Sequence, residues 1–242
     1  MGARQFFFGK LFWGFVFGKR LYDFAFGKTL DKEKGMERIA EVERTTKETA
    51  ITIKINLDGR GEAALDYPIG FMMHMLTAFA RHGLFDLEIK AKGDLEVDQH
   101  HLMEDTGLVL GQCFARALGE RRGIRRVGSC LFPMDETLAR AAVDISGRPF
   151  LVFGADLSDI PLPSSPSRTP EVSSFQTDTV QDFWQGFVST SGIALHLDIL
   201  RGRSSHHKIE ALFKAAARSL REACEIDPAS SDLIPSTKGT IV

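Results

Sequence analysis

The stretches HHLMEDTGLVLGQ (residues 100–112) and HHKIEALFKAA (residues 206–216) are the strongest indication of how the chain folds. Both begin with the pattern HHxxE, and in both an apolar segment with helical spacing follows. The copies lie about a hundred residues apart, and each comes after a strand-like segment and a polar turn. The simplest explanation is the internal duplication of one unit in which a strand precedes a helix.

The spacing inside each copy predicts metal binding. Positions i and i+4 of a helix share one face, with Cβ atoms about 5–6 Å apart, so the first histidine and the glutamate can hold one cation. The second histidine is rotated by about 100° and must serve another site. The i, i+4 pairs are His100 with Glu104 and His206 with Glu210, and the second histidines are His101 and His207.

Two further histidines complete the expected ligand set. His74 and His196 come from different halves of the chain, and adding them gives two sites, each with three imidazoles and one carboxylate. Imidazole suits zinc, iron, copper and nickel, and the carboxylates admit manganese. The set contains no cysteine, which argues against a closed structural zinc site. His82 lies outside the pattern and is expected to be structural.

The composition excludes several classes of protein. The chain has 242 residues, of which 43% are hydrophobic, enough for one large or two small domains. Its net charge of -2 lacks the basic footprint of a nucleic-acid-binding protein. It has no apolar run of about 18 residues, so we expect no membrane span. Three widely separated cysteines form no disulfide framework, which favours the cytoplasm.

Residues 1–35 differ from the remainder. They hold 10 of the 23 aromatic residues and seven Lys or Arg against three Asp or Glu. A motif recurs every nine residues: FFFGK at 6–10, FVFGK at 15–19 and FAFGK at 24–28. Three short copies interrupted by glycine are too few for a solenoid. We expect a disordered or surface-adhering extension without a catalytic role.

Hydrophobic periodicity predicts both strands and helices in the body of the chain. Four prolines among serines predict a loop at 155–175. Strands mixed with helices in both halves favour an α/β or α+β sandwich. The expected strands are 50–57, 84–91, 127–134, 139–145, 149–154 and 193–200, and the expected helices are 71–80, 104–118, 180–192 and 207–226.

These motifs resemble those of the imidazoleglycerol-phosphate dehydratase family. The segments 94–107 and 205–215 look like its two signatures, and shorter matches occur in family order over roughly 200 residues. The shorter matches are RTTKET (44–49), RHGLFD (81–86), PMDE (133–136), SGRP (146–149) and PSTKG (235–239).

The resemblance implies a fold and an assembly. It implies an α/β (α+β) fold like that of ribosomal protein S5 domain 2, with helices between two four-stranded sheets and duplicated halves at 36–130 and 131–242. It also implies a homo-oligomer of 24 subunits with active sites at subunit interfaces and two Mn²⁺ ions per site. The substrate would be imidazoleglycerol phosphate and the product imidazoleacetol phosphate, a step of histidine biosynthesis.

The resemblance also assigns roles to residues. Elimination of water needs a proton shuttle and stabilisation of negative charge on the substrate ring, which two Lewis-acidic cations could supply. The family implies Glu210 and Glu48 as acid/base groups, with Glu48 also contacting substrate. Positions that match phosphate-binding residues are Arg126, Arg148, Ser236 and Lys238, and Lys214 lies one turn beyond Glu210 on the same face.

Two alternatives remain open from the sequence. A metal-dependent hydrolase could use the same two ions, but it would not need the cations that match the phosphate-binding positions. A catalytically impaired paralogue could keep its metals only for assembly. The presence of Glu48, Glu210, Arg126, Arg148 and Lys238 together favours the dehydratase.

Overall fold

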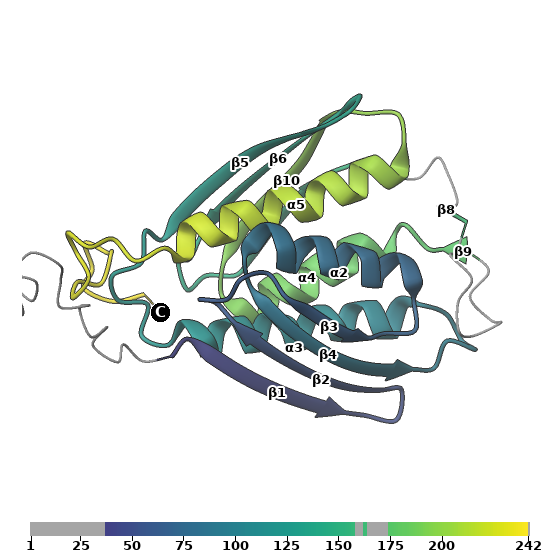
Figure 1. The fold of residues 1–242 in the computed structure, drawn as a ribbon, viewed down its shortest axis with the longest axis horizontal. Coiled ribbons are helices and arrows are strands. Elements are labelled where there is room, and N and C mark those ends of the chain that lie inside the picture. The colour runs from purple at the N-terminus through teal and green to yellow at the C-terminus, as the bar shows by residue number, and fades with distance from the viewer. Residues whose placement is uncertain (1–36, 158–161, 164–173, 242) are drawn as a thin grey trace, which may run out of the picture. The chain divides into compact units, whose positions relative to one another are not determined.

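The computed structural model of the chain describes residues 37–157, 162–163 and 174–241, so the extension at 1–35 lies outside the described residues. Two four-stranded sheets enclose a layer formed by helices α2, α3, α4 and α5 (Figure 1). Each sheet turns one face to the helices and the other outward, and this explains the alternating pattern of the strands. The architecture is α+β, as predicted.

The first half consists of one sheet and two helices. Its strands lie in the order β1-β2-β4-β3. The elements are β1 (Ile39–Thr45), β2 (Thr49–Asn56), β3 (Ala63–Asp66), α2 (Gly70–Gly83), β4 (Asp86–Gly93) and α3 (His100–Leu118).

The second half has the same sequence of elements with one addition. Its strands lie in the order β5-β6-β10-β7, and a short pair, β8 and β9, lies apart from them. The elements are β5 (Val127–Met134), β6 (Thr137–Asp144), β7 (Phe150–Gly154), β8 (Leu162–Pro163), β9 (Ser174–Phe175), α4 (Thr179–Ser191), β10 (Ala194–Arg201) and α5 (Ser205–Cys224).

Strand register shows that the two halves are copies of one unit. Ile39 pairs with Asn56 in the first hairpin and Val127 with Asp144 in the second, so both partners advance by 88 positions (39 to 127, 56 to 144). Further along, Asn56 pairs with Asp86 and Asp144 with Ala194, so β10 follows β4 by 108 positions (86 to 194). The 20 extra residues (108 less 88) lie between β7 and α4, where the proline-rich stretch occurs.

The helices pair across the duplication. Helix α2 packs against α5 of the other half, and α4 packs against α3. Helices α2 and α4 are each followed by a cap residue in the left-handed region, Leu84 and Gly192, which are also 108 positions apart (84 to 192). The predicted boundary at 130 and 131 falls inside β5, the first strand of the second copy.

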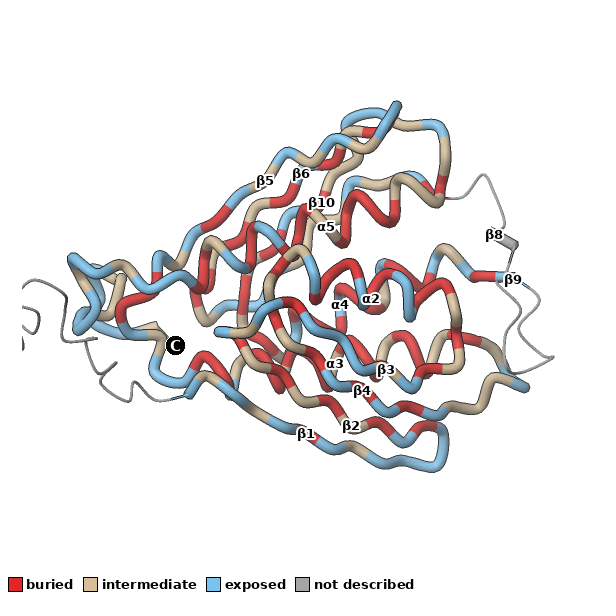
Figure 2. Tube along the Cα trace, in the orientation of Figure 1, coloured by how far each residue is buried: buried red, intermediate tan, exposed pale blue. Residues whose placement is uncertain are grey.

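The core lies between the sheets and is strongly aromatic. Trp184 of α4 is fully buried, and its ring lies within 4.8 Å of Phe213 and 6.3 Å of Phe79, measured between centroids. Buried positions follow the inward faces of the helices and alternate along the strands (Figure 2). This layer fixes the helix ends that carry the histidines.

Helices α3 and α4 approach each other closely at glycines. A Cβ added at Gly107 would overlap the Phe183 carbonyl oxygen, and one at Gly186 would lie 2.6 Å from the Glu104 carbonyl oxygen. Close approach of two backbones requires residues without a side chain at such positions. The contact therefore holds the first turn of α3 against α4.

Most predicted elements occur with shifted ends. β5 matches its predicted range, whereas α3 begins four residues before the predicted start, at His100. The predicted loop at 155–175 contains β8 and β9. Strands β1 and β3 were not predicted. In the described part of the chain, no helix is long and apolar enough to cross a membrane.

Candidate metal centre

Helix α5 carries the second HHxxE copy on its first turns. The Ser204 hydroxyl accepts a hydrogen bond from the His207 amide (3.4 Å) and caps the helix start. Buried residues such as Ile209 and Leu212 fix one face of α5 against the core. His206, which is half-exposed, and Glu210 therefore lie one turn apart beside α2.

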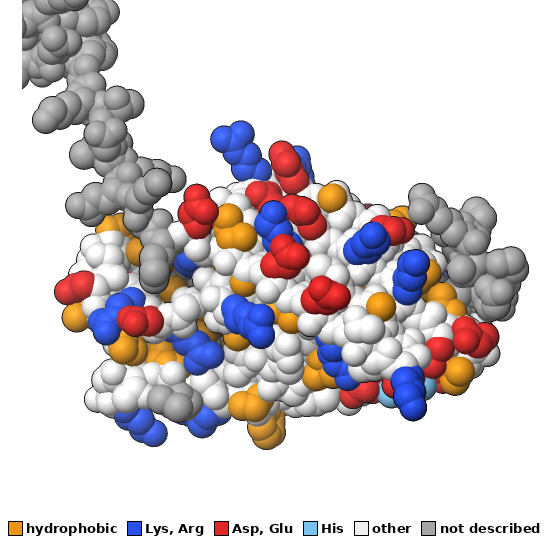
Figure 3. Space-filling view, turned by 90° about the horizontal axis from the view of Figure 1, so that it is seen from below, with side chains coloured by type: hydrophobic (Ala, Val, Ile, Leu, Met, Phe, Trp, Pro, Cys, Tyr) orange, Lys and Arg blue, Asp and Glu red, His pale blue; other side chains and the backbone are white. Residues whose placement is uncertain are grey.

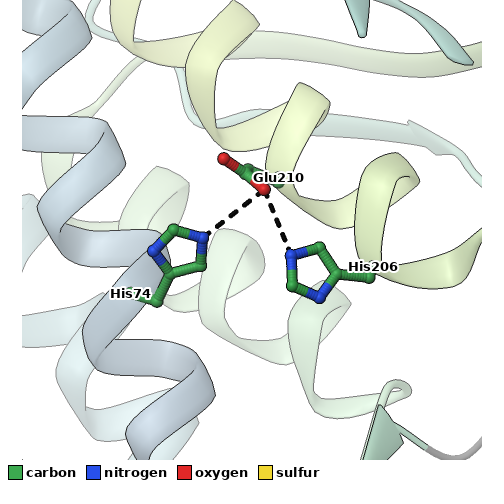
Figure 4. A group of neighbouring side chains, drawn as sticks. All are labelled: His74, His206 and Glu210. Carbon is green, nitrogen blue, oxygen red and sulfur yellow. Dashed lines mark hydrogen bonds and ion pairs between the residues drawn. The ribbon is translucent and has the colours of Figure 1, made fainter. Parts of the chain in front are cut away.

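One cluster of potential ligands joins α5 to α2. Glu210 Oε2 lies 3.2 Å from His206 Nε2 and 3.4 Å from His74 Nε2. Figure 4 marks these two contacts by dashed lines. One ligand atom from each of the three residues falls within 4.8 Å of the others. The i, i+4 pair predicted on α5 is therefore present, and the fold adds His74 from a helix more than a hundred residues away.

The charge of Glu210 is maintained despite its burial. Its side chain is only 8% exposed, and burial by itself would raise its pKa. Lys214 Nζ, 2.7 Å from Glu210 Oε1, together with His74 outweighs this, so the pKa of Glu210 lies below the usual 4.5. A buried carboxylate that remains ionised and has one oxygen directed at two imidazoles is suited to a divalent cation.

A second cluster forms around His207. Its Nδ1 lies 2.9 Å from Glu136 Oε2, and its Nε2 lies 4.0 Å from Asp135 Oδ2. Glu136 Oε1 also accepts hydrogen bonds from the amides of Ser204 (2.9 Å) and Arg203 (3.3 Å). The Ser204 amide and the His207 ring are the main causes that lower the pKa of Glu136 to about 2.

The first HHxxE copy occupies the first turn of α3. His100 Nε2 lies 3.9 Å from Glu104, and His100 Nδ1 lies 3.1 Å from Asp182 of α4. His101 Nδ1 instead contacts Asp94 Oδ2 at 3.0 Å, and this hydrogen bond is the main cause that raises the pKa of His101. The two histidines of the copy therefore have different partners, as their angular separation predicted.

The internal repeat relates Asp182 to His74. Asp182 lies ten residues before Gly192, as His74 lies ten before Leu84 (192 less 182, 84 less 74). His196 of β10 corresponds to Glu88 of β4 rather than to His74 (88 to 196, again 108 positions). The two additional ligands predicted from sequence are therefore not equivalent positions of the repeat.

His196 lies away from the helix clusters. It is exposed on the outward face of the second sheet, because its neighbours Leu195 and Leu197 point into the core. In the described part of the chain, it joins no group of three potential ligands. Within the described part of one chain, His196 therefore lies on the surface with too few neighbouring ligands to form a metal site.

The residues predicted to bind phosphate are spread over several loops. Arg126 forms a two-pronged ion pair with Asp144 (2.6 and 3.0 Å) and donates to the Pro235 carbonyl oxygen (2.9 Å). It thus ties down the segment that contains Ser236 and Lys238. Arg148 and Lys238 are exposed, while Lys214 contacts Glu210.

Glu48 lies in the turn between β1 and β2 and is exposed. Together with Lys47 and Asp94 it lines an open hollow of about 310 Å³. No hydrogen bond to its carboxylate is found among the described residues, although its charge contributes to raising the pKa of His101. His82 is not part of either cluster, and its ring packs edge-on against Phe132 at 5.3 Å.

Sequence reasoning missed the acidic partners Asp94, Glu136 and Asp182. A signal existed for Glu136, because Glu136-Thr137 follows Glu48-Thr49 at the interval of 88 positions that relates the two hairpins (48 to 136). Asp182 meets His100 only through the packing of α4 on α3, whereas Asp94 reaches His101 across the short segment that precedes α3.

Comparison with known proteins gives one consistent family. The family model described as imidazoleglycerol-phosphate dehydratase matches residues 67–220. The imidazoleglycerol-phosphate dehydratase of Methylorubrum populi is 48% identical over 204 residues, which cover 84% of this chain and 100% of the relative. That of Ruegeria pomeroyi is 50% identical over the same shares.

Solved structures agree with this comparison. The dehydratase of Staphylococcus aureus has a TM-score of 0.66 and 36% identity, covering 78% of this chain and 99% of its own. The Pyrococcus furiosus enzyme has a TM-score of 0.65 and 31% identity, covering 82% and 99%. With a duplicated α+β fold, two HHxxE helices and close relatives over most of its length, the chain belongs to the imidazoleglycerol-phosphate dehydratase family.

Proposed function

We propose that the chain removes water from imidazoleglycerol phosphate to give imidazoleacetol phosphate, a step of histidine biosynthesis. Family membership supports the reaction. The observation that carries it at the level of the site is the convergence of His74, His206 and Glu210 from two helices. These groups offer nitrogen and oxygen ligands but no thiolate, as expected of a site that performs Lewis-acid chemistry.

The ion we propose is Mn²⁺, with two ions per active site. Imidazole and carboxylate donors fit such an ion, and the ionised state of Glu210 supports the fit. When bound, the ions would stabilise negative charge that develops on the substrate ring. The proposed ligands are His74, His100, His101, Glu104, His196, His206, His207 and Glu210.

We assign proton transfer to two glutamates. Glu48 is exposed and borders a hollow, so its carboxylate is available to a substrate. Glu210 contacts Lys214 through one oxygen and the histidines through the other, so it would act beside the ions. Glu48 is therefore the better candidate for exchanging protons with the carbon atoms.

Phosphate binding is proposed for residues of the loops and the C-terminal segment. Exposed Arg148 and Lys238 offer positive charges, and Ser236 offers a hydroxyl. Arg126 holds the Pro235 carbonyl oxygen and so fixes this segment, and Lys214 supplies charge next to Glu210. We propose that these residues together bind the phosphate group of the substrate.

Assembly into 24 identical subunits is also proposed. The row Glu41–Lys54–Glu88–Ala64 crosses the outer face of the first sheet, where Lys, Arg, Asp and Glu side chains intermingle (Figure 3). The equivalent row of the second sheet is Ser129–Ala142–His196–Val152. Only this row has lost its charges, because the next row keeps the Arg140–Asp198 ion pair. We take the uncharged row through exposed His196 as support for contact with another subunit at this face. Three free cysteines support a cytoplasmic location.

A coupled assay tests the function. Purified protein with Mn²⁺ should form imidazoleacetol phosphate, and EDTA should abolish turnover until Mn²⁺ is restored. A catalytically impaired paralogue would bind metal without turnover, and a hydrolase would retain its activity in the Arg148→Ala variant. Full dehydratase activity in the presence of a strong chelator would exclude the proposed metal dependence.

A further inference from the structure

We propose that Glu136 is a positioning residue that fixes the ring of His207, so that Nε2 is left as the ligand atom. Nothing in the HHxxE pattern assigns a role to Glu136. The inference rests on the proposed function, because it concerns how this chain prepares one of the proposed metal ligands. It is carried by the contacts of a single carboxylate.

The carboxylate of Glu136 is fully engaged in the described structure. Oε1 accepts from the amides of Ser204 and Arg203, at 2.9 and 3.3 Å, just before α5 begins. Oε2 lies 2.9 Å from His207 Nδ1. An ionised carboxylate can only accept hydrogen bonds, so the His207 ring must donate its Nδ1 proton. Nε2 then carries the free lone pair that a metal requires.

The position of Nε2 agrees with this assignment. Its nearest acid, Asp135, lies 4.0 Å away, beyond hydrogen-bond distance, and the Asp135 side chain is 80% exposed. Both oxygens of Glu136 already contact protein donors, the two amides through Oε1 and the His207 ring through Oε2. The cluster of Asp135, Glu136 and His207 therefore presents one oriented metal ligand, the His207 ring, rather than a complete metal site.

In the first half, a different residue orients the second histidine of the HHxxE copy. His101 Nδ1 lies 3.0 Å from Asp94 Oδ2, so Asp94 holds the equivalent histidine. The hairpin glutamate of that half, Glu48, corresponds to Glu136 (48 to 136, 88 positions) but makes no such contact. Each half thus provides one carboxylate for its second histidine, and Glu48 remains available for the proposed chemistry.

The Glu136→Gln variant separates positioning from folding. Its Oε1 can still accept from the Ser204 and Arg203 amides, which keeps the start of α5 in place. Its NH₂ group would then face His207 Nδ1 and favour the tautomer whose proton is on Nε2. Rotating the amide would instead direct NH₂ at two backbone donors, so the variant cannot restore both contacts.

The experiment measures Mn²⁺ binding to the full chain by equilibrium dialysis with metal analysis. We expect Glu136→Gln to weaken one class of Mn²⁺ site by about 10- to 100-fold, the usual cost of removing a group that orients a metal ligand. Its melting temperature without metal should stay near that of the wild type. Asp94→Ala should weaken binding similarly through His101.

Two controls make the result decisive. Glu120→Gln changes an exposed carboxylate that pairs with Arg122 and should leave Mn²⁺ affinity unchanged. Ser204→Ala removes the α5 cap without touching Nδ1, so it should lower stability more than affinity. Wild-type Mn²⁺ affinity in Glu136→Gln would overturn the positioning role alone. Failure of the wild type to bind Mn²⁺ would overturn the proposed metal, whatever the variants do.

Discussion

Glu210 is the residue at which the charges of two helices meet. Its two oxygens face opposite partners, Lys214 on one side and His74 and His206 on the other. Removing the charge should disturb the ligand cluster and leave Lys214 unpaired in a largely buried position. The effect of a substitution here should therefore exceed that of a surface glutamate.

Glu210→Gln should reduce kcat at least about 100-fold in the Mn²⁺-supplemented assay, within the range of losses for acid/base groups. It should also lower the Mn²⁺ content measured after dialysis. Glu120→Gln is the matched control and should behave like the wild type, because Glu120 is exposed and distant in sequence. A Glu210→Gln enzyme with normal turnover would remove Glu210 from the catalytic machinery.

The carboxylate of Asp86 makes the stability of the turn at residues 60–62 dependent on pH. Its Oδ1 accepts hydrogen bonds from the amides of Arg60 (2.7 Å), Gly61 and Glu62 (both 3.1 Å). Partial burial would raise the pKa of Asp86, but these amides and Asn56 outweigh it and lower the pKa below 3.8. The stabilisation is therefore present above pH 3.8 and is lost as the pH falls through the lower folded pKa.

The Asp86→Asn variant should accordingly lose less stability than the wild type on acidification below about pH 4. Urea unfolding of both proteins at several pH values measures this difference. At neutral pH the variant should be the less stable of the two, because it lacks the charge that the amides bind. Parallel pH profiles would show that Asp86 does not contribute to acid unfolding.

At the level of single residues, the sequence predicted contacts within a helix better than contacts between helices. The spacing of His206 and Glu210 alone placed them together, and the structure agrees. Asp182 could not be assigned, since an acid in an amphipathic helix is usually only solvated. Its contact with His100 depends on how α4 packs against α3.

The elements were predictable where periodicity was strong. The bounds of β5 and α4 lie within one residue of their predicted ranges. β1 was missed because it carries three charged residues in the segment IAEVERT, and β3 is only four residues long. Short or charged edge strands leave little hydrophobic pattern to read.

The α3–α4 contact gives a test at the scale of elements. Gly107→Ala should lower the free energy of unfolding by about 1–3 kcal/mol, the usual cost of overpacking, because the new methyl group would meet the Phe183 carbonyl oxygen. Denaturant unfolding measures the loss. Arg116→Ala, an exposed change on the same helix, should have little effect. If the Gly107→Ala protein were as stable as the wild type, α3 and α4 could move apart to admit a methyl group without loss of stability.

At the scale of the whole molecule, the two outer faces differ although the halves share one fold. Glu43 on the first sheet corresponds to Leu131 on the second (43 to 131, 88 positions), and Leu131 is 60% exposed. Such a difference between copies of one unit is explained if only the second face is covered by another subunit.

Leu131→Glu should therefore convert the proposed assembly into smaller species, visible by analytical ultracentrifugation. The reason is that a charge buried at a subunit contact costs several kcal/mol unless it is paired. Ala64→Glu places the same charge on the exposed first sheet and should leave the sedimentation coefficient unchanged. Identical sedimentation of wild type and Leu131→Glu would move the subunit contact elsewhere.

The outward position of His196 has a genetic consequence. If this imidazole serves a neighbouring protomer, then His196→Ala and His74→Ala inactivate different contributors to a shared centre. Hybrids formed by co-expressing the two inactive variants would contain some centres in which one variant supplies His74 and the other supplies His196. These centres should recover part of the activity that neither variant has alone. Such interallelic complementation, scored in a histidine auxotroph, would be absent if every centre drew its ligands from one polypeptide.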